Sequence, residues 1–121
     1  MRRWQIVMVL LGATGLAAGC NSACTFESEP ALIVTVVDSV TAQNITPGSA
    51  VVARQGFFID SVFVAPNASQ TSVSLGYDRP GIYTVTVHHA GYREWRRDGI
   101  LVPGSGCGVR DPIALTTRLI P

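Results

Sequence analysis

The chain has 121 residues, of which 47% are hydrophobic and 14% are charged. This length accommodates one ordinary domain and excludes a multidomain enzyme. Nine Arg, no Lys and eight acidic residues give a net charge of +1, so the chain lacks the basic excess with which nucleic-acid-binding proteins neutralise phosphates. We therefore expect no nucleic-acid partner.

The N-terminus has the pattern of an export signal. Arg2 and Arg3 precede a largely apolar stretch over residues 4–18. That stretch is shorter than the ~20 apolar residues that a transmembrane helix needs, and no later stretch approaches that length without a charged residue or a proline. The sequence therefore predicts an N-terminal signal helix and no membrane span.

The run Leu16-Ala17-Ala18-Gly19-Cys20 resembles the signal of bacterial lipoproteins, although that family prefers Leu where this chain has Ala17. The resemblance implies that residues 1–19 are a lipoprotein signal peptide. It also implies that Cys20 carries the lipid, which includes palmitate, and that residues 20–30 are a lipidated tether. Asn21, in place of an Asp, implies the outer membrane. The alternative is ordinary cleavage after small residues, which leaves a secreted or periplasmic protein with Cys20 unpaired.

The two remaining cysteines predict a disulfide bond. Export places Cys24 and Cys107 in an oxidising compartment, where an isolated pair normally becomes oxidised. Closing so long a loop contributes about 4.5 kcal/mol of stability in the chain-entropy model. Two cysteines are too few ligands for zinc, and a strand points the adjacent His88 and His89 to opposite faces. We expect neither a metal site nor a cofactor.

From residue 31 onward the composition is that of an all-β domain, because Val, Ile and Thr favour strands and are abundant. Segments with the pattern of strands cover residues 31–38, 49–54, 57–64, 71–77, 82–89, 92–95, 100–102 and 113–119. Asp78-Arg79-Pro80-Gly81 has the residues of a turn, and Gln55-Gly56 indicates a hairpin turn or a bulge. The sequence predicts a seven-stranded Greek-key β-sandwich over residues 31–121.

Hydropathy also predicts which faces of the strands are buried. Residues 31–38 are nearly all apolar, which indicates burial on both faces. In the segment 57–64, Phe57, Ile59 and Phe63 share one face and Asp60 lies on the other. The segment 82–89 alternates strictly, with its aromatic and valine side chains on one face.

Four motifs together resemble the carboxypeptidase regulatory-like domains: Leu32-Ile33-Val34-Thr35-Val36-Val37-Asp38; Arg79-Pro80-Gly81-Ile82-Tyr83-Thr84-Val85-Thr86-Val87; Ala90-Gly91-Tyr92-Arg93-Glu94-Trp95; and Ile113-Ala114-Leu115-Thr116-Thr117-Arg118-Leu119 after Cys107. The likeness extends over nearly the whole chain after the tether. It implies a transthyretin-like, or prealbumin-like, β-sandwich with an accessory role and no catalytic activity. It implies no substrate.

The residues needed for catalysis do not occur in the required patterns. The chain has no Gly-x-Ser-x-Gly nucleophile elbow. It ends Arg118-Leu119-Ile120-Pro121 and lacks the Tyr-Arg-Gly-Ser tail of a transthyretin-like hydrolase. The three tyrosines have the pattern of core or corner residues, and we interpret the glycine-rich loop over residues 104–108 as one that flanks the disulfide. We therefore predict that the protein is not an enzyme.

One cluster indicates a binding patch. Arg93, Trp95, Arg96 and Arg97 follow one another closely, and an exposed Trp between guanidinium groups is suited to stack a sugar or hold an anionic envelope component. The alternative is that Trp95 packs at the core margin and the arginines are solvated. We predict a lipid-anchored structural or protein-interaction module of the bacterial envelope, whose partners are the membrane and an envelope protein or glycan. The alternative is a small-ligand or glycan-binding β-sandwich at the cell surface.

Overall fold

The structure is a computed structural model that describes residues 28–121. Cys20, Cys24 and the predicted signal peptide lie outside the described residues, so the predictions that concern them remain predictions. Within residues 28–121 the chain forms strands and no helix, which confirms the all-β prediction. The strands are β1 (Leu32–Asp38), β2 (Ser49–Gln55), β3 (Phe58–Phe63), β4 (Val73–Leu75), β5 (Gly81–His89), β6 (Trp95–Val102), β7 (Gly104–Ser105), β8 (Gly108–Val109) and β9 (Ile113–Leu119).

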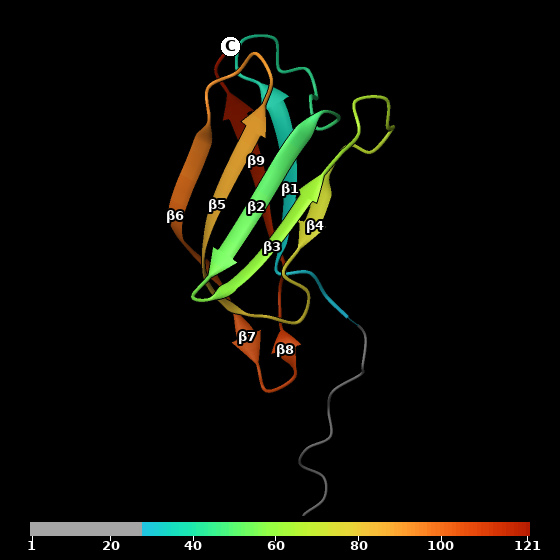
Figure 1. Cartoon of the computed structure of the whole chain (residues 1–121). Coiled ribbons are helices and arrows are strands. Elements are labelled where there is room, and N and C mark those ends of the chain that lie inside the picture. Colours follow the sequence, from blue (N-terminus) through green and yellow to red (C-terminus); the bar gives the residue numbers. More distant parts are fainter. Residues whose placement is uncertain (1–27) are drawn as a thin grey trace, which may run out of the picture.

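The seven longer strands form two sheets, which lie one in front of the other (Figure 1). The front sheet has four antiparallel strands in the order β3-β2-β5-β6, and the rear sheet has three strands in the order β4-β1-β9. β1 pairs antiparallel with β4 and parallel with β9. β7 and β8 form a separate short hairpin at one end of the domain (Figure 1). No helix in residues 28–121 is long and apolar enough to cross a membrane.

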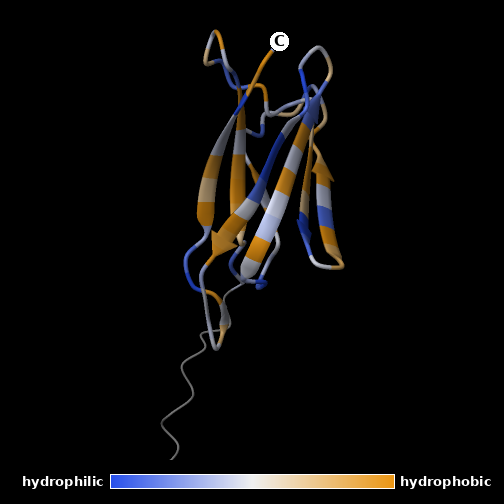
Figure 2. Cartoon of the chain, turned by 90° about the vertical axis from the view of Figure 1, so that its left-hand side faces the viewer, coloured by the Kyte–Doolittle hydropathy of each residue, from blue (hydrophilic) through white to orange (hydrophobic). Residues whose placement is uncertain are grey.

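The inward faces of both sheets contribute to one hydrophobic core, an arrangement consistent with a β-sandwich. Hydrophobic and hydrophilic residues alternate along the strands (Figure 2). In β5 the aromatic and valine side chains are buried, as the alternation predicted: Tyr83, Val85 and Val87. The prediction that β1 is buried on both faces is wrong for Ile33 and Thr35, which are only half-buried because they lie on the outer face of the rear sheet, although Val37 on that face is buried.

Strand β3 is oriented against its hydropathy. Phe57, Ile59 and Phe63 are exposed, whereas Asp60 is half-buried on the inward side, where its carboxylate Oδ2 accepts a hydrogen bond from the backbone N–H of Gly76 at 2.9 Å. The hairpin explains Phe57: Gln55 pairs with Phe58, so Gly56 and Phe57 are the two central turn residues. The φ of Gly56 is +61°, as a type II′ turn requires at its first central position.

Two other predictions about the strands need correction. Residues 92–95 and 100–102 are not separate strands, because Trp95–Val102 forms the single edge strand β6, whose register with β5 shifts between Tyr83 and Val85. The segment 71–77 contributes only the three residues of β4. In addition, the glycine-rich loop expected over residues 104–108 contains β7 and the first residue of β8, so Cys107 lies in the turn between these two short strands.

Candidate functional site

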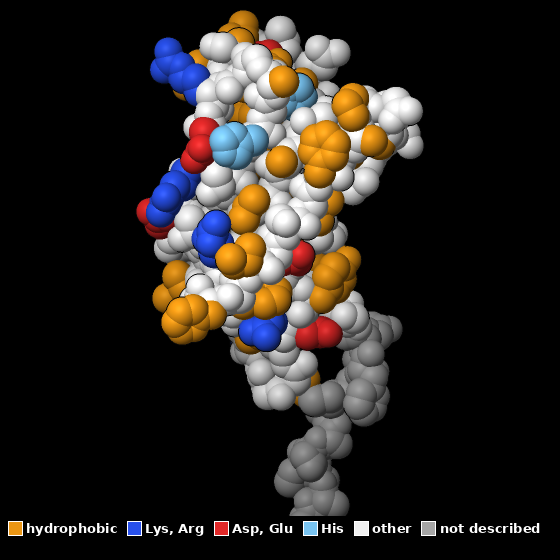
Figure 3. Space-filling model, viewed as in Figure 1, with side chains coloured by type: hydrophobic (Ala, Val, Ile, Leu, Met, Phe, Trp, Pro, Cys, Tyr) orange, Lys and Arg blue, Asp and Glu red, His pale blue; other side chains and the backbone are white. Residues whose placement is uncertain are grey.

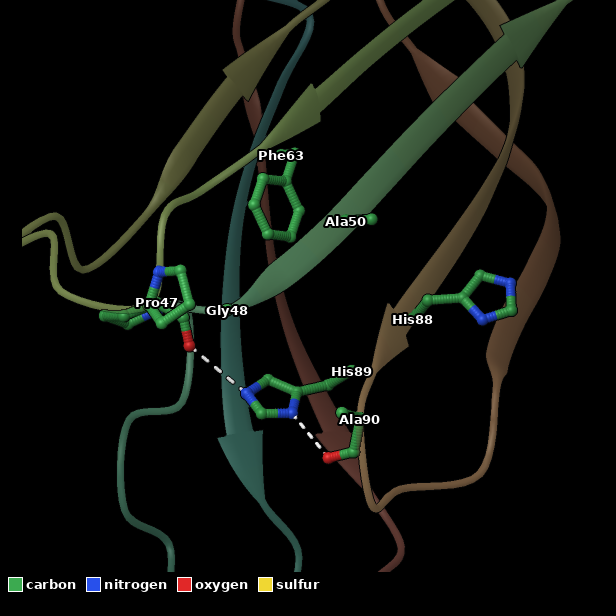
Figure 4. A pocket seen from close by; sticks show the side chains of 8 residues that line it. Pro47, Gly48, Ala50, Phe63, His88, His89 and Ala90 are labelled. Carbon is green, nitrogen blue, oxygen red and sulfur yellow. Dashed lines mark hydrogen bonds between the residues drawn. The ribbon is translucent and has the colours of Figure 1, made fainter.

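The clearest binding feature of the described residues is a cavity of about 590 Å³ at the end of the front sheet where β2 begins and β5 ends. We call it the distal cavity. It gathers three segments that the strand register brings side by side, because Ala50 of β2 is opposite Phe63 of β3 on one side and His88 of β5 on the other. Its lining residues are Pro47, Gly48, Ala50, Phe63, Pro66, His88, His89 and Ala90 (Figure 4).

The walls of the distal cavity are mainly apolar. Phe63 lines the cavity together with Pro47 and Pro66 and is 65% exposed, so its ring is available to a partner. None of the eight lining residues carries a hydroxyl, a thiol or a carboxylate. The only side chains that hydrogen-bond in the cavity are the two histidines. This composition suits the binding of an apolar group beside an imidazole.

The imidazole of His89 is held in place by the surrounding backbone. Its Nδ1 lies 2.9 Å from the carbonyl oxygen of Ala90, and its Nε2 lies 3.2 Å from that of Pro47 (Figure 4). A neutral imidazole has one N–H group, so it donates to only one of these two carbonyls at a time. Tyr92 packs edge-on against the same ring, with the centroids 5.1 Å apart. His89 is therefore a fixed wall of the cavity.

Asp38 extends this support toward the rear sheet. Its Oδ2 accepts a hydrogen bond of 2.7 Å from the Tyr92 hydroxyl, and its Oδ1 accepts bonds from the backbone N–H groups of Val40 and Thr41. The Thr41 amide, then the Tyr92 hydroxyl, then the Val40 amide lower the pKa of Asp38. The same bond to Asp38 is the main reason that the pKa of Tyr92 is raised. The carboxylate thus anchors the tyrosine that backs His89.

His88 points to the solvent side of the sheet, away from His89 (Figure 4). Its Nε2 lies 3.0 Å from a carboxylate oxygen of Glu94, and both side chains are about half exposed. The two histidines therefore face different neighbours. Within residues 28–121 no group of three or more His, Cys, Asp or Glu side chains is placed to hold a metal ion.

The structure separates the residues of the predicted arginine and tryptophan patch. Trp95 pairs with the fully buried Val87 and packs, half-buried, against the core. The guanidinium carbon of Arg97 lies 5.4 Å from the centre of the Trp95 ring, a cation–π contact. Arg96 instead pairs with Thr86, one residue further along and therefore toward the opposite face. The exposed Arg93 precedes the strand and donates its backbone N–H to Ile120.

Arg96 is occupied by an ion pair on the outer face of the front sheet. Its Nε donates to Oδ1 of Asp98 at 3.1 Å, and the same oxygen accepts a bond from the Thr84 hydroxyl. The bond from Arg96, followed by that from Thr84, lowers the pKa of Asp98. Of the four predicted patch residues, Trp95 and Arg97 therefore contact each other, whereas Arg96 is paired with Asp98 on the opposite face of the strand.

The comparisons with known proteins give no assignment: neither models of protein families, nor curated proteins, nor solved structures match this chain. The distal cavity was not predicted from the sequence. One feature of the sequence pointed toward it. Phe57, Ile59 and Phe63 lie on one face of their strand and Asp60 on the other, and this alternation alone does not show whether the apolar face is buried in the core or exposed to a partner. The position of the cavity itself depends on the register among β3, β2 and β5.

Proposed function

We propose that this protein is a non-enzymatic, lipid-anchored protein of the bacterial envelope that binds another envelope protein through the distal cavity. The observation that carries the proposal is the exposed ring of Phe63 in an apolar cavity at one end of the domain. An apolar cavity rimmed by proline is suited to take up an apolar side chain of a partner. The absence of hydroxyl, thiol and carboxylate groups from its lining supports binding without catalysis.

The direction in which the chain enters the domain supports the anchor. Ser28 and Glu29 hydrogen-bond to Asp78, which belongs to the turn before β5. The distal cavity lies where β5 ends, at the opposite end of the same strand. A lipid on Cys20 would therefore hold the domain by one end and leave the cavity facing away from the membrane.

For the fold, we propose a Greek-key β-sandwich of the carboxypeptidase regulatory-like, transthyretin-like type. Seven strands divided between a four-stranded and a three-stranded sheet support it. The chain also passes from one sheet to the other after β1, β3, β4 and β6, as strands of a sandwich with crossed connections do.

Photocrosslinking tests the binding role. A photoreactive amino acid replaces Phe63 in the cavity or, as the matched control, Ile59, which is exposed on the same face of the same strand but outside the cavity. We expect a discrete crosslinked envelope protein from position 63 and none from position 59. Equal crosslinking from both positions, or none from either, would contradict a partner in the cavity.

The second candidate is a small ligand, which the volume of the cavity favours. About 590 Å³ lies within the range of small-molecule sites, roughly 300–1,000 Å³. A glycan array and a panel of small apolar ligands distinguish the two functions. Binding of one of these compounds that is lost in Phe63→Ser and kept in Ile59→Ser would show that the cavity binds a small ligand.

The lipid anchor has its own test. Metabolic labelling with palmitate should label the wild-type chain and not Cys20→Ala. Equal labelling of both, or of neither, would refute the anchor and favour the secreted or periplasmic alternative.

A further inference from the structure

The end of the domain opposite the distal cavity carries a second group of exposed apolar side chains. We call this the entry end, because the described chain begins there. Phe57 is fully exposed at the tip of the β2–β3 turn, and Ile82 and Leu101, which pair with each other across β5 and β6, are 62% and 64% exposed. Figure 3 shows apolar side chains at the lower end of the front sheet and again toward the upper end, with charged side chains and smaller groups of apolar side chains between them.

Phe57 is an unusual residue for its position. The centre of a two-residue hairpin turn normally holds small or polar residues, because its side chain points into solvent. Here the turn itself needs only the positive φ of Gly56. Phe57 is absent from the core and from the side chains that pack on it, so folding does not account for an aromatic ring at this tip.

Hydrogen bonds and close contacts join the turns of the entry end into one unit. Gln55 Nε2 donates to the carbonyl oxygen of Pro80, which ties the β2–β3 turn to the turn before β5. Gly104 of β7 packs so closely on Pro80 that a Cβ there would lie 2.5 Å from the proline ring. Asp78 of the same turn accepts hydrogen bonds from Ser28 and Glu29. The chain therefore enters at the same end of the domain as the β2–β3 turn and the β7–β8 hairpin (Figure 1).

The length of chain before Ser28 limits where a membrane can lie. Eight Cα–Cα steps separate Cys20 from Ser28, and they span at most about 28 Å. The nine residues of β5 alone extend over about 30 Å from the entry end toward the distal cavity. A lipid on Cys20 thus keeps the entry end within about 28 Å of the bilayer and lets it touch the bilayer at any extension of the tether, whereas the cavity would reach the bilayer only at nearly full extension.

The predicted disulfide shortens this distance further. Cys107 lies at the tip of the β7–β8 hairpin, at the entry end. Four Cα–Cα steps, about 14 Å, separate Cys20 from Cys24. A Cys24–Cys107 bond, with its Cα atoms about 5.5 Å apart, would keep Cys20 within about 20 Å of the hairpin tip.

We propose that the entry end rests on the bilayer that holds the Cys20 lipid, and that Phe57 inserts between the lipid headgroups with Ile82 and Leu101 beside it. The inference rests on the proposed lipid anchor. Aromatic side chains favour the membrane interface, and one exposed ring adds apolar contact that the lipid chains alone do not provide. The contact fixes the domain's orientation, so that the distal cavity points away from the membrane.

The charges of the entry end favour an apolar contact with lipid. Three arginines, Arg54, Arg79 and Arg110, are balanced by three acidic residues, Glu29, Asp78 and Asp111. Arg110 is itself paired with Asp111 at 3.3 Å. The guanidinium of Arg79 lies over the Phe58 ring, 4.1 Å from its centre, where it can reach the headgroups while its stem stays against the protein. This balance predicts a contact that high salt does not release.

Fluorescence quenching in vesicles tests the proposal with the full lipidated chain. Phe57→Trp reports on the entry end, and Phe63→Trp is the matched control, because it places the same ring at an exposed position beside the distal cavity. Both are reconstituted in phosphatidylethanolamine–phosphatidylglycerol vesicles with and without brominated acyl chains, and the wild-type signal of Trp95 is subtracted. Brominated lipid should reduce the Phe57→Trp signal by about half or more, in low and high salt, and leave the Phe63→Trp signal unchanged.

The outcomes separate this inference from the anchor. If the protein floats with the vesicles and neither tryptophan is quenched, the anchor stands and the contact is wrong. Equal quenching of both would overturn the proposed orientation, and quenching that salt abolishes would overturn its apolar nature. A wild-type chain that takes up no palmitate and does not float would overturn both the anchor and the inference.

Discussion

The orientation of β3 makes a prediction in which the structure and the hydropathy pattern give opposite rankings. If Phe57, Ile59 and Phe63 faced the core, Ile59→Ala would be costly and Asp60→Ala would be neutral. In the structure Ile59 is 52% exposed and Asp60 is half-buried and hydrogen-bonded to the Gly76 amide. We therefore expect Asp60→Ala to be the more destabilising of the two.

The magnitudes follow from these two environments. Removing the acceptor of a partly buried N–H costs about 1–3 kcal/mol, so Asp60→Ala should lower the free energy of unfolding by that amount. A buried Ile→Ala change costs about 2–5 kcal/mol, but a largely exposed one should cost less than about 1 kcal/mol. Ser61→Ala, exposed on the same strand, is the control and should be neutral.

Urea unfolding monitored by Trp95 fluorescence gives the free energies for wild type and the three variants. A lower midpoint at an unchanged slope identifies a change in stability. The structural account of β3 would be refuted by an Ile59→Ala variant that loses more than about 2 kcal/mol while Asp60→Ala unfolds like wild type.

Three further predictions concern the stability of the domain. Gly76→Ala should lower the free energy of unfolding by more than about 2 kcal/mol, because φ is +71° and the new Cβ would lie 2.6 Å from the Tyr83 hydroxyl. Gly56→Ala, whose Cβ would lie in open space, should cost about 1 kcal/mol. Equal losses of stability in thermal unfolding would contradict the close approach of Gly76 to Tyr83. Hydrogen bonds lower the pKa of Asp38 in the folded state, so the contribution of its carboxylate to stability is present above the ordinary value of 3.8 and is lost as the pH falls through the folded pKa. The stability of wild type should therefore fall more steeply with acid than that of Asp38→Asn. The same dependence of stability on pH in both proteins would exclude this role. If the predicted disulfide is present, reductant should lower the melting temperature of wild type by the equivalent of about 4.5 kcal/mol and leave the melting temperature of Cys107→Ser unchanged. A wild-type melting temperature that reductant does not change would contradict the disulfide.

The elements that the sequence predicts well are those with one face in the core and one in solvent. The strict alternation of residues 82–89 corresponds to β5, with Tyr83 buried and its hydroxyl donating to the Arg79 carbonyl at 2.6 Å. The apolar run of residues 31–38 corresponds to β1. In both cases burial against the core dominates the segment, so hydropathy is sufficient to locate the strand, although in β1 it does not distinguish the half-buried Ile33 and Thr35 from their buried neighbours.

The sequence predicts two segments where the structure has the single strand β6, because the middle of this strand is polar. Arg96, Arg97, Asp98 and Gly99 have the composition of a loop, yet they belong to one strand from Trp95 to Val102. β6 lies at the edge of its sheet, where side chains on both faces reach water and charge is tolerated. Pairing with β5, rather than burial, therefore sets its conformation, and pairing leaves no periodic signal in a single sequence.

The distal cavity could not be predicted for a different reason. Its lining comes from residues 47–50, 63–66 and 88–90, and their proximity depends on the opposition of Ala50 to both Phe63 and His88. A shift of β3 by one residue would turn Phe63 inward and remove the cavity wall. The hydrogen bond that the Gly76 amide donates to Asp60 opposes that shift, because the carboxylate would then face solvent and the amide would lose its acceptor.

The same orientation of β3 places exposed aromatic rings at both ends of the front sheet. Between Phe57 at one end and Phe63 at the other, the outer face carries Ile59 together with the Arg96–Asp98 ion pair and the Thr84–Asp98 hydrogen bond, two polar contacts that water solvates well. A continuous apolar face would favour association of whole sheets. Two apolar ends separated by polar rows instead suit two different occupants, a bilayer at the entry end and a partner at the cavity. The length of β5 would then hold that partner about 30 Å from the membrane. Because the length of the tether limits this geometry, inserting residues before Ser28 should loosen the orientation of the domain on the membrane without weakening the affinity of the cavity for its partner.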